Sequence, residues 1–219
     1  MIEYSYRQYN WLAFYINNRS FNLVSHLIKG TVLDLGCGEK PFKKEIQKLS
    51  QNYFGIDWPL SVHNKDGIDI YSNISKALPI KSDSVDTIVS FQVMEHLPEP
   101  LVFLKECRRI LCKRGNIILT TPFMWGVHES PYDYYRYTQY GLKYLMEKSG
   151  FRNIRVMPNT GFWVMAGLRL NYHLNQYKIR MIRPILQMLF RVSQKLALHL
   201  DRIDFNSSDT ASFTATAEK

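Results

Sequence analysis

The sequence predicts an α/β fold in which helices cover both faces of a doubly wound, mostly parallel sheet of seven strands. Short apolar, β-branched runs alternate with helix-like stretches along the chain, which is typical of strands joined by helical crossovers. The first run, residues 31–35, breaks into Gly36 and Gly38, a signal for a strand that ends in a tight turn. The length of 219 residues and the hydrophobic content of 46% suit one such unit with a buried core.

The expected elements are short segments bounded by turn residues. We expect strands at residues 31–35, 53–57, 68–71, 85–91, 116–121, 154–157 and 211–217. We expect helices at residues 2–29 (one or two), at 42–49, from Pro98 and Pro100 onward, and at 138–149, where Gly150 provides the C-cap. The chain is therefore interpreted as one domain over residues 1–219, with N-terminal helices at 1–29, a core at 30–158, a helical insertion at 159–207 and the last strand at 208–219.

The net charge of +9 comes mostly from the insertion. Residues 167–200 hold no acid and six basic residues, namely Arg169, Lys178, Arg180, Arg183, Arg191 and Lys195. Polar residues recur every four positions (Arg183, Gln187, Arg191, Lys195, His199), while Met181, Ile185, Leu189, Val192, Leu196 and Leu200 fall on the other side. This pattern predicts an amphipathic helix over residues 181–200. Two interpretations stay open, a lid that packs on its own domain and a surface that contacts an anionic membrane.

Other features restrict the function classes. Nucleic-acid binding is not expected, because no recognition motif accompanies the basic charge. The three cysteines, Cys37, Cys107 and Cys112, lack metal-ligand spacing, so no metal site is expected and a reducing compartment is favoured. The N-terminal stretch has no signal-peptide pattern. We therefore expect a cytoplasmic protein, in contact with the cytoplasmic face of a membrane if the insertion binds one.

The turn after the first strand has the form of a cofactor-binding loop. Gly36 and Gly38 would let a ligand approach the backbone, and Asp57 follows Gly38 by 19 residues at the end of the second strand. An acid at this place can accept both hydroxyls of a ribose, so the spacing indicates an adenosine-containing ligand. Pro41 occupies the third glycine position of a dinucleotide motif, which disfavours nicotinamide. The bland alternative is a turn that binds nothing.

Four stretches in sequence carry a family resemblance. Residues 32–42 (VLDLGCGEKPF), 53–57 (YFGID), 78–90 (LPIKSDSVDTIVS) and 93–98 (VMEHLP) resemble class I S-adenosylmethionine-dependent methyltransferases, and most of all the type-11 group. The resemblance covers about residues 25 to 158. It implies a Rossmann-like fold, S-adenosylmethionine as the cofactor and S-adenosylhomocysteine as its product.

The resemblance also implies roles for individual cofactor-side residues. The loop of Gly36, Cys37 and Gly38 would line the methionine part of the cofactor, braced by Asp34. Asp57 would hold the ribose, with Trp58 beside the adenine and Asn73 toward its amino group. Phe91 would lie near the sulfonium or be a core aromatic, two interpretations that are equally supported. Lys40 stands where a third loop glycine often occurs.

The acceptor side is expected on the loop after the fifth strand, residues 122–138. Loops at the carboxyl ends of strands are where α/β folds bind substrate. His128 is the leading candidate for a general base, and His96, in the Glu95–His96 pair, is the second, each with the alternative of a structural role. The candidate substrate-binding residues are Trp125, Tyr134, Tyr135, Arg136 and Tyr137. The alternative is that Asp133 and Arg136 form an ordinary ion pair, that Thr138 is a helix N-cap and that the tyrosines close the core.

These observations together predict a methyltransferase that acts on a small-molecule, glycan or lipid-linked acceptor, at oxygen. The glycan option comes from the stretch HESPYDYYRYT at residues 128–138, which resembles one in bacterial enzymes linked to surface-polysaccharide synthesis. The first alternative is a non-catalytic relative that keeps the cofactor fold as an interaction module. The second is a nicotinamide-dependent oxidoreductase.

Overall fold

The computed structural model describes residues 5–59, 67–177 and 180–219. Its strands are β1 (Thr31–Leu35), β2 (Asn52–Asp57), β3 (Ile70–Tyr71), β4 (Val85–Phe91), β5 (Leu111–Pro122), β6 (Arg152–Pro158) and β7 (Ser212–Glu218). Its α-helices are α1 (Trp11–Val24), α2 (Lys43–Leu49), α3 (Pro100–Ile110), α4 (Gln139–Lys148), α5 (Phe162–Leu174) and α6 (Arg183–Ile203). Short 3-10 helices occur at η1 (Ser25–Leu27), η2 (Met94–His96), η3 (Arg180–Ile182) and η4 (Ser207–Asp209).

The seven strands form one mixed sheet in the order β3-β2-β1-β4-β5-β7-β6. The first five are parallel, and β7 runs antiparallel between β5 and β6. This confirms the predicted mostly parallel, doubly wound sheet. The β5 strand begins earlier than residue 116 and passes through Gly115, where a Cβ would lie 3.0 Å from the carbonyl oxygen of Cys112 and 3.1 Å from that of Asp86. The close backbone approach explains why a residue that resembles a turn glycine lies inside a strand.

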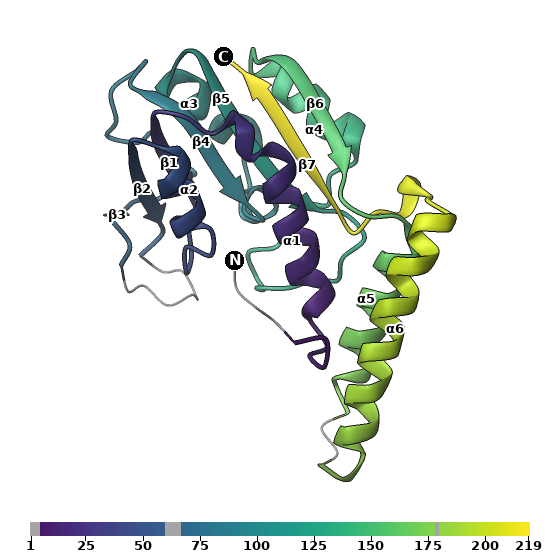
Figure 1. The fold of residues 1–219 in the computed structure, drawn as a ribbon. Helices are drawn as coiled ribbons and strands as arrows, with labels where there is room; N and C mark the ends of the chain where they lie inside the picture. The colour runs from purple at the N-terminus through teal and green to yellow at the C-terminus, as the bar shows by residue number, and fades with distance from the viewer. Residues whose placement is uncertain (1–4, 60–66, 178–179) are drawn as a thin grey trace.

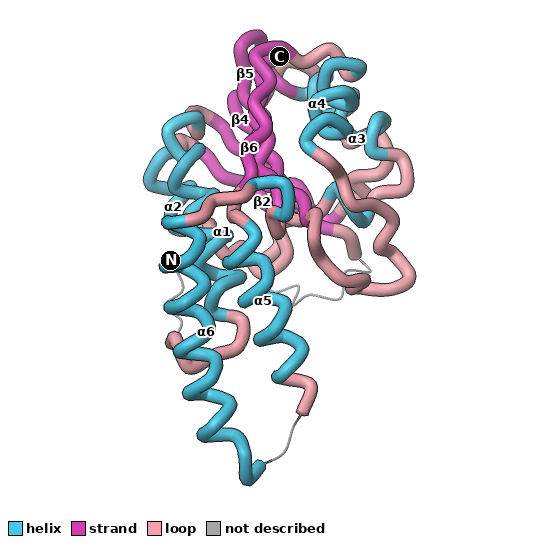
Figure 2. Tube along the Cα trace, turned by 90° about the vertical axis from the view of Figure 1, so that its right-hand side faces the viewer, coloured by secondary structure: helices cyan, strands magenta, loops and turns pink. Residues whose placement is uncertain are grey.

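Helices cover both faces of the sheet, which Figure 2 shows edge-on with α3 and α4 on one side and α1 and α2 on the other. On the α3–α4 face, Phe103 and Leu142 pack against strand residues such as Ile117. On the opposite face, Phe21 of α1 and Ile46 of α2 pack with other strand residues. Both faces of the parallel strands are therefore buried, which is why these strands are apolar runs without alternation.

Two sequence predictions about helix ends are confirmed at α4. The Thr138 hydroxyl accepts a hydrogen bond from the backbone N–H of Gly141 at 3.1 Å, the geometry of an N-cap. At the other end Gly150 has φ +86°, and its N–H and that of Phe151 bond the carbonyls of Glu147 and Met146. A left-handed residue at this place closes the helix, and glycine adopts it without strain.

The predicted insertion forms a hairpin of α5 and α6 that extends beyond the sheet (Figure 1). It is attached through a small apolar cluster in which Leu12 and Ile16 of α1 contact Val164 and Leu168 of α5. Gly167 lets the two hairpin helices approach, since a Cβ there would lie 2.8 Å from that of Ala197. Among the described residues, no helix is long and apolar enough to cross a membrane.

The side of α6 that packs against the rest of the protein differs from the apolar side that the sequence pattern indicates. The buried positions are Phe190, Gln194, Ala197 and Asp201. Gln194 donates to backbone carbonyls of residues 6 and 8, and Asp201 accepts from the N–H groups of residues 161 and 164. The predicted apolar side is largely exposed at Met181, Ile185, Leu189, Val192 and Leu196. Polar side chains thus anchor the helix, and its apolar row faces solvent.

Candidate functional site

A cavity of about 310 Å³ opens at the carboxyl ends of β1, β2 and β4. In the sheet, β2 lies on one side of β1 and β4 lies on the other, so the direction of strand addition reverses at β1. The cavity is therefore at the topological switch point, where α/β sheets bind ligands. Its volume suits a small organic molecule. It is lined by Gly36, Asp57, Trp58, Asn73, Ile74, Ser75, Gln92, Val93, His96, Leu97, Pro98, Glu129, Tyr132 and Tyr134.

The glycine loop contacts the cavity through Gly36, whose φ is +72°. A Cβ on Gly36 would lie 2.5 Å from a methyl carbon of Val93, so only glycine leaves room for that side chain. The backbone N–H groups of Gly36 and Cys37 both donate to the Ile56 carbonyl, at 2.8 and 3.1 Å. These donors are bound to β2, so the loop is held rigidly and approaches a ligand with its bare glycine surface.

Asp57 connects this loop to the wall of the cavity. One carboxylate oxygen accepts from the Gly38 N–H at 2.6 Å, and the other accepts from the Trp58 N–H at 2.6 Å. The side chain is buried and lines the cavity. Each oxygen keeps a further acceptor position, because a carboxylate oxygen has two lone pairs. Asn73 lines the same cavity, and its side-chain oxygen accepts from the Ser75 N–H at 2.9 Å.

Asp34 and Lys40 flank the loop in the sequence, and their side chains bind residues in or just beyond β2. The Asp34 carboxylate accepts a hydrogen bond of 2.7 Å from the Tyr53 hydroxyl, and burial raises the pKa of Asp34 to about 7. Lys40 adopts φ +53°, the conformation that a loop glycine would supply, and its ammonium lies 2.7 Å from the Asp69 carboxylate. It also donates to the Gly67 carbonyl. Lys40 therefore ties the loop to the segment beyond β2, a role that the sequence analysis did not foresee.

The end of β4 separates two neighbouring side chains. Phe91 packs on the α1–α2 face, with ring centroids 5.1 Å from Phe42 and 6.3 Å from Phe21, and it is not among the residues that line the cavity. The next residue, Gln92, lines the cavity. Gln92 lies just past the end of β4 and has φ +56°, so it is the chain's departure from the strand that separates its side chain from that of Phe91. Of the two interpretations of Phe91, its position is that of a core aromatic, packed against Phe42 and Phe21.

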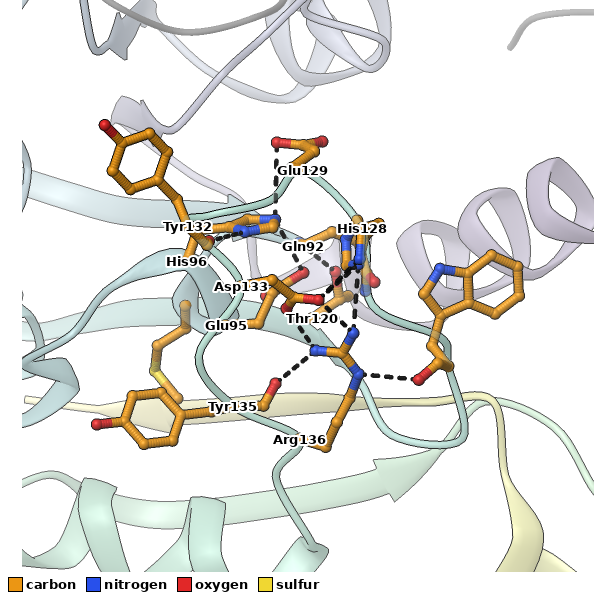
Figure 3. Close-up of polar contacts among 12 residues, drawn as sticks. Gln92, Glu95, His96, Thr120, His128, Glu129, Tyr132, Asp133, Tyr135 and Arg136 are labelled. Atoms are coloured by element: carbon orange, nitrogen blue, oxygen red, sulfur yellow. Dashed lines mark hydrogen bonds and ion pairs between the residues drawn. The ribbon is translucent and has the colours of Figure 1, made fainter.

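The acceptor loop is organised around Arg136 (Figure 3). Its guanidinium binds both oxygens of the Asp133 carboxylate, at 2.6 and 2.7 Å. The remaining N–H groups donate to the backbone carbonyls of Trp125, Tyr135 and Gly126. A guanidinium has five N–H donors, so these contacts use all of them. The Asp133 side chain is only 2% exposed, and the guanidinium beside it holds its pKa well below the usual range.

Of the predicted substrate-side aromatics, Tyr134 lines the cavity and the others lie elsewhere. Tyr137 is buried with its hydroxyl on the Met94 carbonyl, and Tyr135 donates to the Pro98 carbonyl. Trp125 packs against Tyr172 of α5 at a ring distance of 4.8 Å. Tyr132, which sequence reasoning did not select, lines the cavity and contacts Trp58 edge-on at 5.4 Å. In a run of four nearby tyrosines, the sequence contains no signal that tells these positions apart.

Glu95, His96 and His128 converge beside the cavity (Figure 3). The ring centroids of the two histidines are 4.9 Å apart, and His96 Nε2 lies 3.8 Å from a Glu95 oxygen. Glu95 is fully buried, and this burial raises its pKa to about 8. Burial lowers the pKa of His128, which favours the neutral imidazole that a general base requires. His128 lies 32 residues beyond His96, so the sequence alone does not show that they meet.

Comparison with known proteins finds a family match and distant relatives. Residues 33–119 match a family described as "Methyltransferase domain". A probable S-adenosylmethionine-dependent methyltransferase of Mycolicibacterium smegmatis is 33% identical over 96 residues, covering 42% of this chain and 37% of the relative. A ubiquinone biosynthesis O-methyltransferase of Nitrosococcus oceani is 31% identical over 100 residues, covering 41% of this chain and 42% of the relative. The matched stretch thus spans about two fifths of these relatives' length.

Solved structures extend the likeness of fold over nearly the whole chain. A SAM-dependent methyltransferase from Archaeoglobus fulgidus superposes with a TM-score of 0.60 at 16% identity, covering 95% of this chain and 94% of that one. A possible histamine N-methyltransferase from Thermotoga maritima gives 0.61 at 16% identity, covering 96% and 93%. The family match over residues 33–119, the strand order of the sheet and the glycine loop with Asp57 all indicate the same kind of domain. Residues 33–119 thus match a methyltransferase domain, within a fold of the class I S-adenosylmethionine-dependent type, whose methyl donor is S-adenosylmethionine.

Proposed function

We propose that this chain transfers a methyl group from S-adenosylmethionine to an oxygen atom of a small-molecule, glycan or lipid-linked acceptor. The observation that carries the proposal is that one cavity joins Gly36 and Asp57, on the cofactor side, to His96, on the acceptor side. The O-methyltransferase name of one relative supports oxygen as the acceptor atom. In the cavity, Asp57 accepts from the ribose, Trp58 and Asn73 flank the adenine, and Gly36 leaves room for the methionine part.

The reaction needs alignment and the removal of one proton. An acceptor oxygen attacks the methyl carbon in line, the C–S bond breaks, and its electron pair stays on sulfur to give S-adenosylhomocysteine. Holding the oxygen close and aligned supplies most of the rate in such a displacement. The acceptor proton leaves to a neutral imidazole, and His96 and His128 are the two candidates because both lie at this end of the site.

The test uses the purified protein. Calorimetry with S-adenosylhomocysteine and with NAD should detect the first and not the second, and labelled S-adenosylmethionine incubated with a cell extract should label an acceptor. His128→Ala should keep the affinity for S-adenosylhomocysteine and slow transfer about a hundredfold or more. Binding without transfer to any acceptor would favour a non-catalytic interaction module, and NAD binding alone would favour an oxidoreductase.

The exposed row of α6 supports a lipid-linked acceptor within this proposal. Met181, Val192 and Leu196 are 89%, 56% and 52% exposed. Arg191 and Lys195 follow Met188 and Val192 by three residues, so cations border the apolar row. A helix with this pattern suits an anionic membrane surface. The described residues that line the cavity come from the range 36–134, which does not favour the lid interpretation.

Vesicle sedimentation tests this membrane contact. The protein should bind vesicles that contain phosphatidylglycerol more tightly than neutral ones, and added salt should weaken the binding. Val192→Glu should weaken binding about tenfold, because it removes an exposed apolar side chain that the membrane would bury and adds a charge that anionic lipids repel. Val102→Glu, at a 47% exposed position of α3, is the matched control and should bind as the wild type does. Equal binding by both variants would contradict the contact through α6.

A further inference from the structure

A buried carboxylate that lacks a hydrogen-bond partner among the described residues lies beside the cavity. Glu95 is 0% exposed, and within the described part of the chain neither of its side-chain oxygens has a hydrogen-bond partner. Burying an ionised carboxylate without a partner is very costly, so such a group is neutralised by a proton or paired with a cation. Arg136, the nearby basic residue, already uses its donors on the loop.

Two imidazoles offer nitrogen lone pairs to the same place. His96 Nδ1 lies 2.6 Å from the Tyr132 carbonyl oxygen, which can only accept, so Nδ1 carries the proton and the neutral ring has its lone pair on Nε2. That Nε2 atom is buried and has no hydrogen-bond partner in the described residues. His128 Nδ1 lies 3.4 Å from the Asp133 carboxylate and 3.3 Å from a guanidinium nitrogen of Arg136. A backbone carbonyl or carboxylate behind each ring is the arrangement that orients metal-binding histidines.

The spacing of these groups fits one ion. Ligand atoms of Glu95, His96 and His128 all lie within 4.8 Å of one another. Two ligands on opposite sides of an ion, with bonds of about 2.1 Å, are about 4.2 Å apart, so small side-chain rotations would close the site. The surrounding charge favours a cation, because among the described residues Asp133 and Glu129 place negative charge near Glu95, and Arg136 supplies the positive charge there.

We propose that Glu95, His96 and His128 bind a divalent transition-metal cation beside the cavity. Two imidazoles and one carboxylate favour manganese, iron or zinc over magnesium, which prefers oxygen ligands. The ligand His96 itself lines the cavity, so the open positions of the ion face the acceptor. The metal site itself does not depend on the proposed function. Only the role of the ion in methyl transfer rests on that function.

A bound ion would change how the acceptor loses its proton. The cation lowers the pKa of a hydroxyl that coordinates it, so the proton passes to water in the open cavity. The acceptor oxygen then forms the new bond to the methyl carbon, and the electron pair of the C–S bond stays on sulfur. In this scheme the two histidines hold the ion, and neither has to accept the proton.

The decisive measurement is metal binding by the purified, chelator-treated protein. Titration with Mn²⁺, Zn²⁺ and Mg²⁺ by calorimetry, with the Mn²⁺ electron-paramagnetic signal as a second readout, should give one Mn²⁺ or Zn²⁺ ion per chain and weaker Mg²⁺ binding. Glu95→Gln and His128→Asn should each weaken the binding of Mn²⁺ at least tenfold. The matched controls are Glu147→Gln and His26→Asn, at exposed positions of α4 and η1, which should bind as the wild type does.

Two further readouts keep the outcomes distinct. Unchanged affinity of Glu95→Gln for S-adenosylhomocysteine would show that the variant folds, so that its lost metal binding supports the site. The proposal is overturned if the wild type binds no ion, or if the ligand variants and the controls bind equally. Metal binding without any methyl transfer would support the ion site and contradict the proposed function.

Discussion

Asp57 is a residue with two tasks, because its carboxylate holds the glycine loop through Gly38 and also lines the cavity. Gly36 has a comparable dual constraint, since its positive φ and the nearby Val93 side chain both exclude a Cβ. At such positions the local conformation and the ligand impose the same residue. This is why a short pattern of glycines and one acid locates the turn and its acidic neighbour at the cavity.

The ribose role of Asp57 is directly testable. Asp57→Ala should raise the dissociation constant of S-adenosylhomocysteine at least tenfold, about 1.4 kcal/mol, because both the ribose and the Gly38 N–H lose their acceptor. Calorimetry measures this. Asp83→Ala, just before the start of β4 and thus at the far end of the sheet, is the control and should bind normally. Unchanged affinity in Asp57→Ala would remove the ribose role.

Asp34 should make stability depend on pH. Its folded pKa of about 7 lies above the ordinary value of 3.8, so between about pH 4 and 7 the folded chain keeps a proton that the unfolded chain has lost. Rising pH then lowers the free energy of unfolding by up to about 1.4 kcal/mol per unit. Asp34→Asn retains an acceptor for Tyr53 and should flatten this slope in denaturant unfolding across that range. Parallel pH profiles for the two proteins would contradict the raised pKa.

At the scale of elements, the acceptor loop of residues 122–138 contains little regular secondary structure, and hydrogen bonds within it and to Glu95 hold it in place. Arg136 connects its two ends by donating to the carbonyls of Trp125 and Gly126, and the backbone N–H groups of Tyr134 and Tyr135 both donate to the Glu95 carbonyl. The sequence analysis offered a substrate contact or an ion pair for Arg136. The observed contacts are those of the ion pair, and substrate binding by Arg136 stays a prediction.

Removing the guanidinium should destabilise this loop. Arg136→Met leaves the buried Asp133 carboxylate without its partner and should lower the free energy of unfolding by about 3 kcal/mol. Adding Asp133→Asn should recover part of this loss, because the uncompensated charge disappears. Denaturant unfolding of both single variants and the double variant measures the coupling. If the losses simply add, the pair does not stabilise the loop.

At the scale of the whole molecule, the hairpin of α5 and α6 near the end of the chain packs against α1 near its start. Leu12 of α1 is 0% exposed and belongs to the same apolar cluster as Val164 and Leu168 of α5. Gln194 of α6 adds hydrogen bonds to backbone carbonyls just before α1. The hairpin therefore depends on α1, although about 150 residues of chain separate them.

Leu12→Ala tests this dependence. The cavity left in the cluster should cost about 3 kcal/mol, and amide exchange should accelerate in α5 and α6 more than in the central strands. Leu23→Ala, at a 50% exposed position of the same helix, is the control. Faster exchange spread evenly over the sheet, with no excess in the hairpin, would show that α1 does not anchor it.

The sequence alone determined the parallel strands, the glycine turn, the acid at position 57 and the caps of α4. These features depend on local physics, such as apolar periodicity, positive φ at glycine and the capping of free N–H groups. The family resemblance supplied the cofactor. None of this needed knowledge of which distant segments meet.

Only the tertiary structure decided the rest. It placed β7 between β5 and β6, turned Phe91 into the core and Gln92 into the cavity, and exposed the apolar row of α6. It also brought His128 to Glu95 and His96, across an intervening helix and strand. Contacts between distant segments depend on strand register and on how helices pack, and a local pattern of residues carries neither.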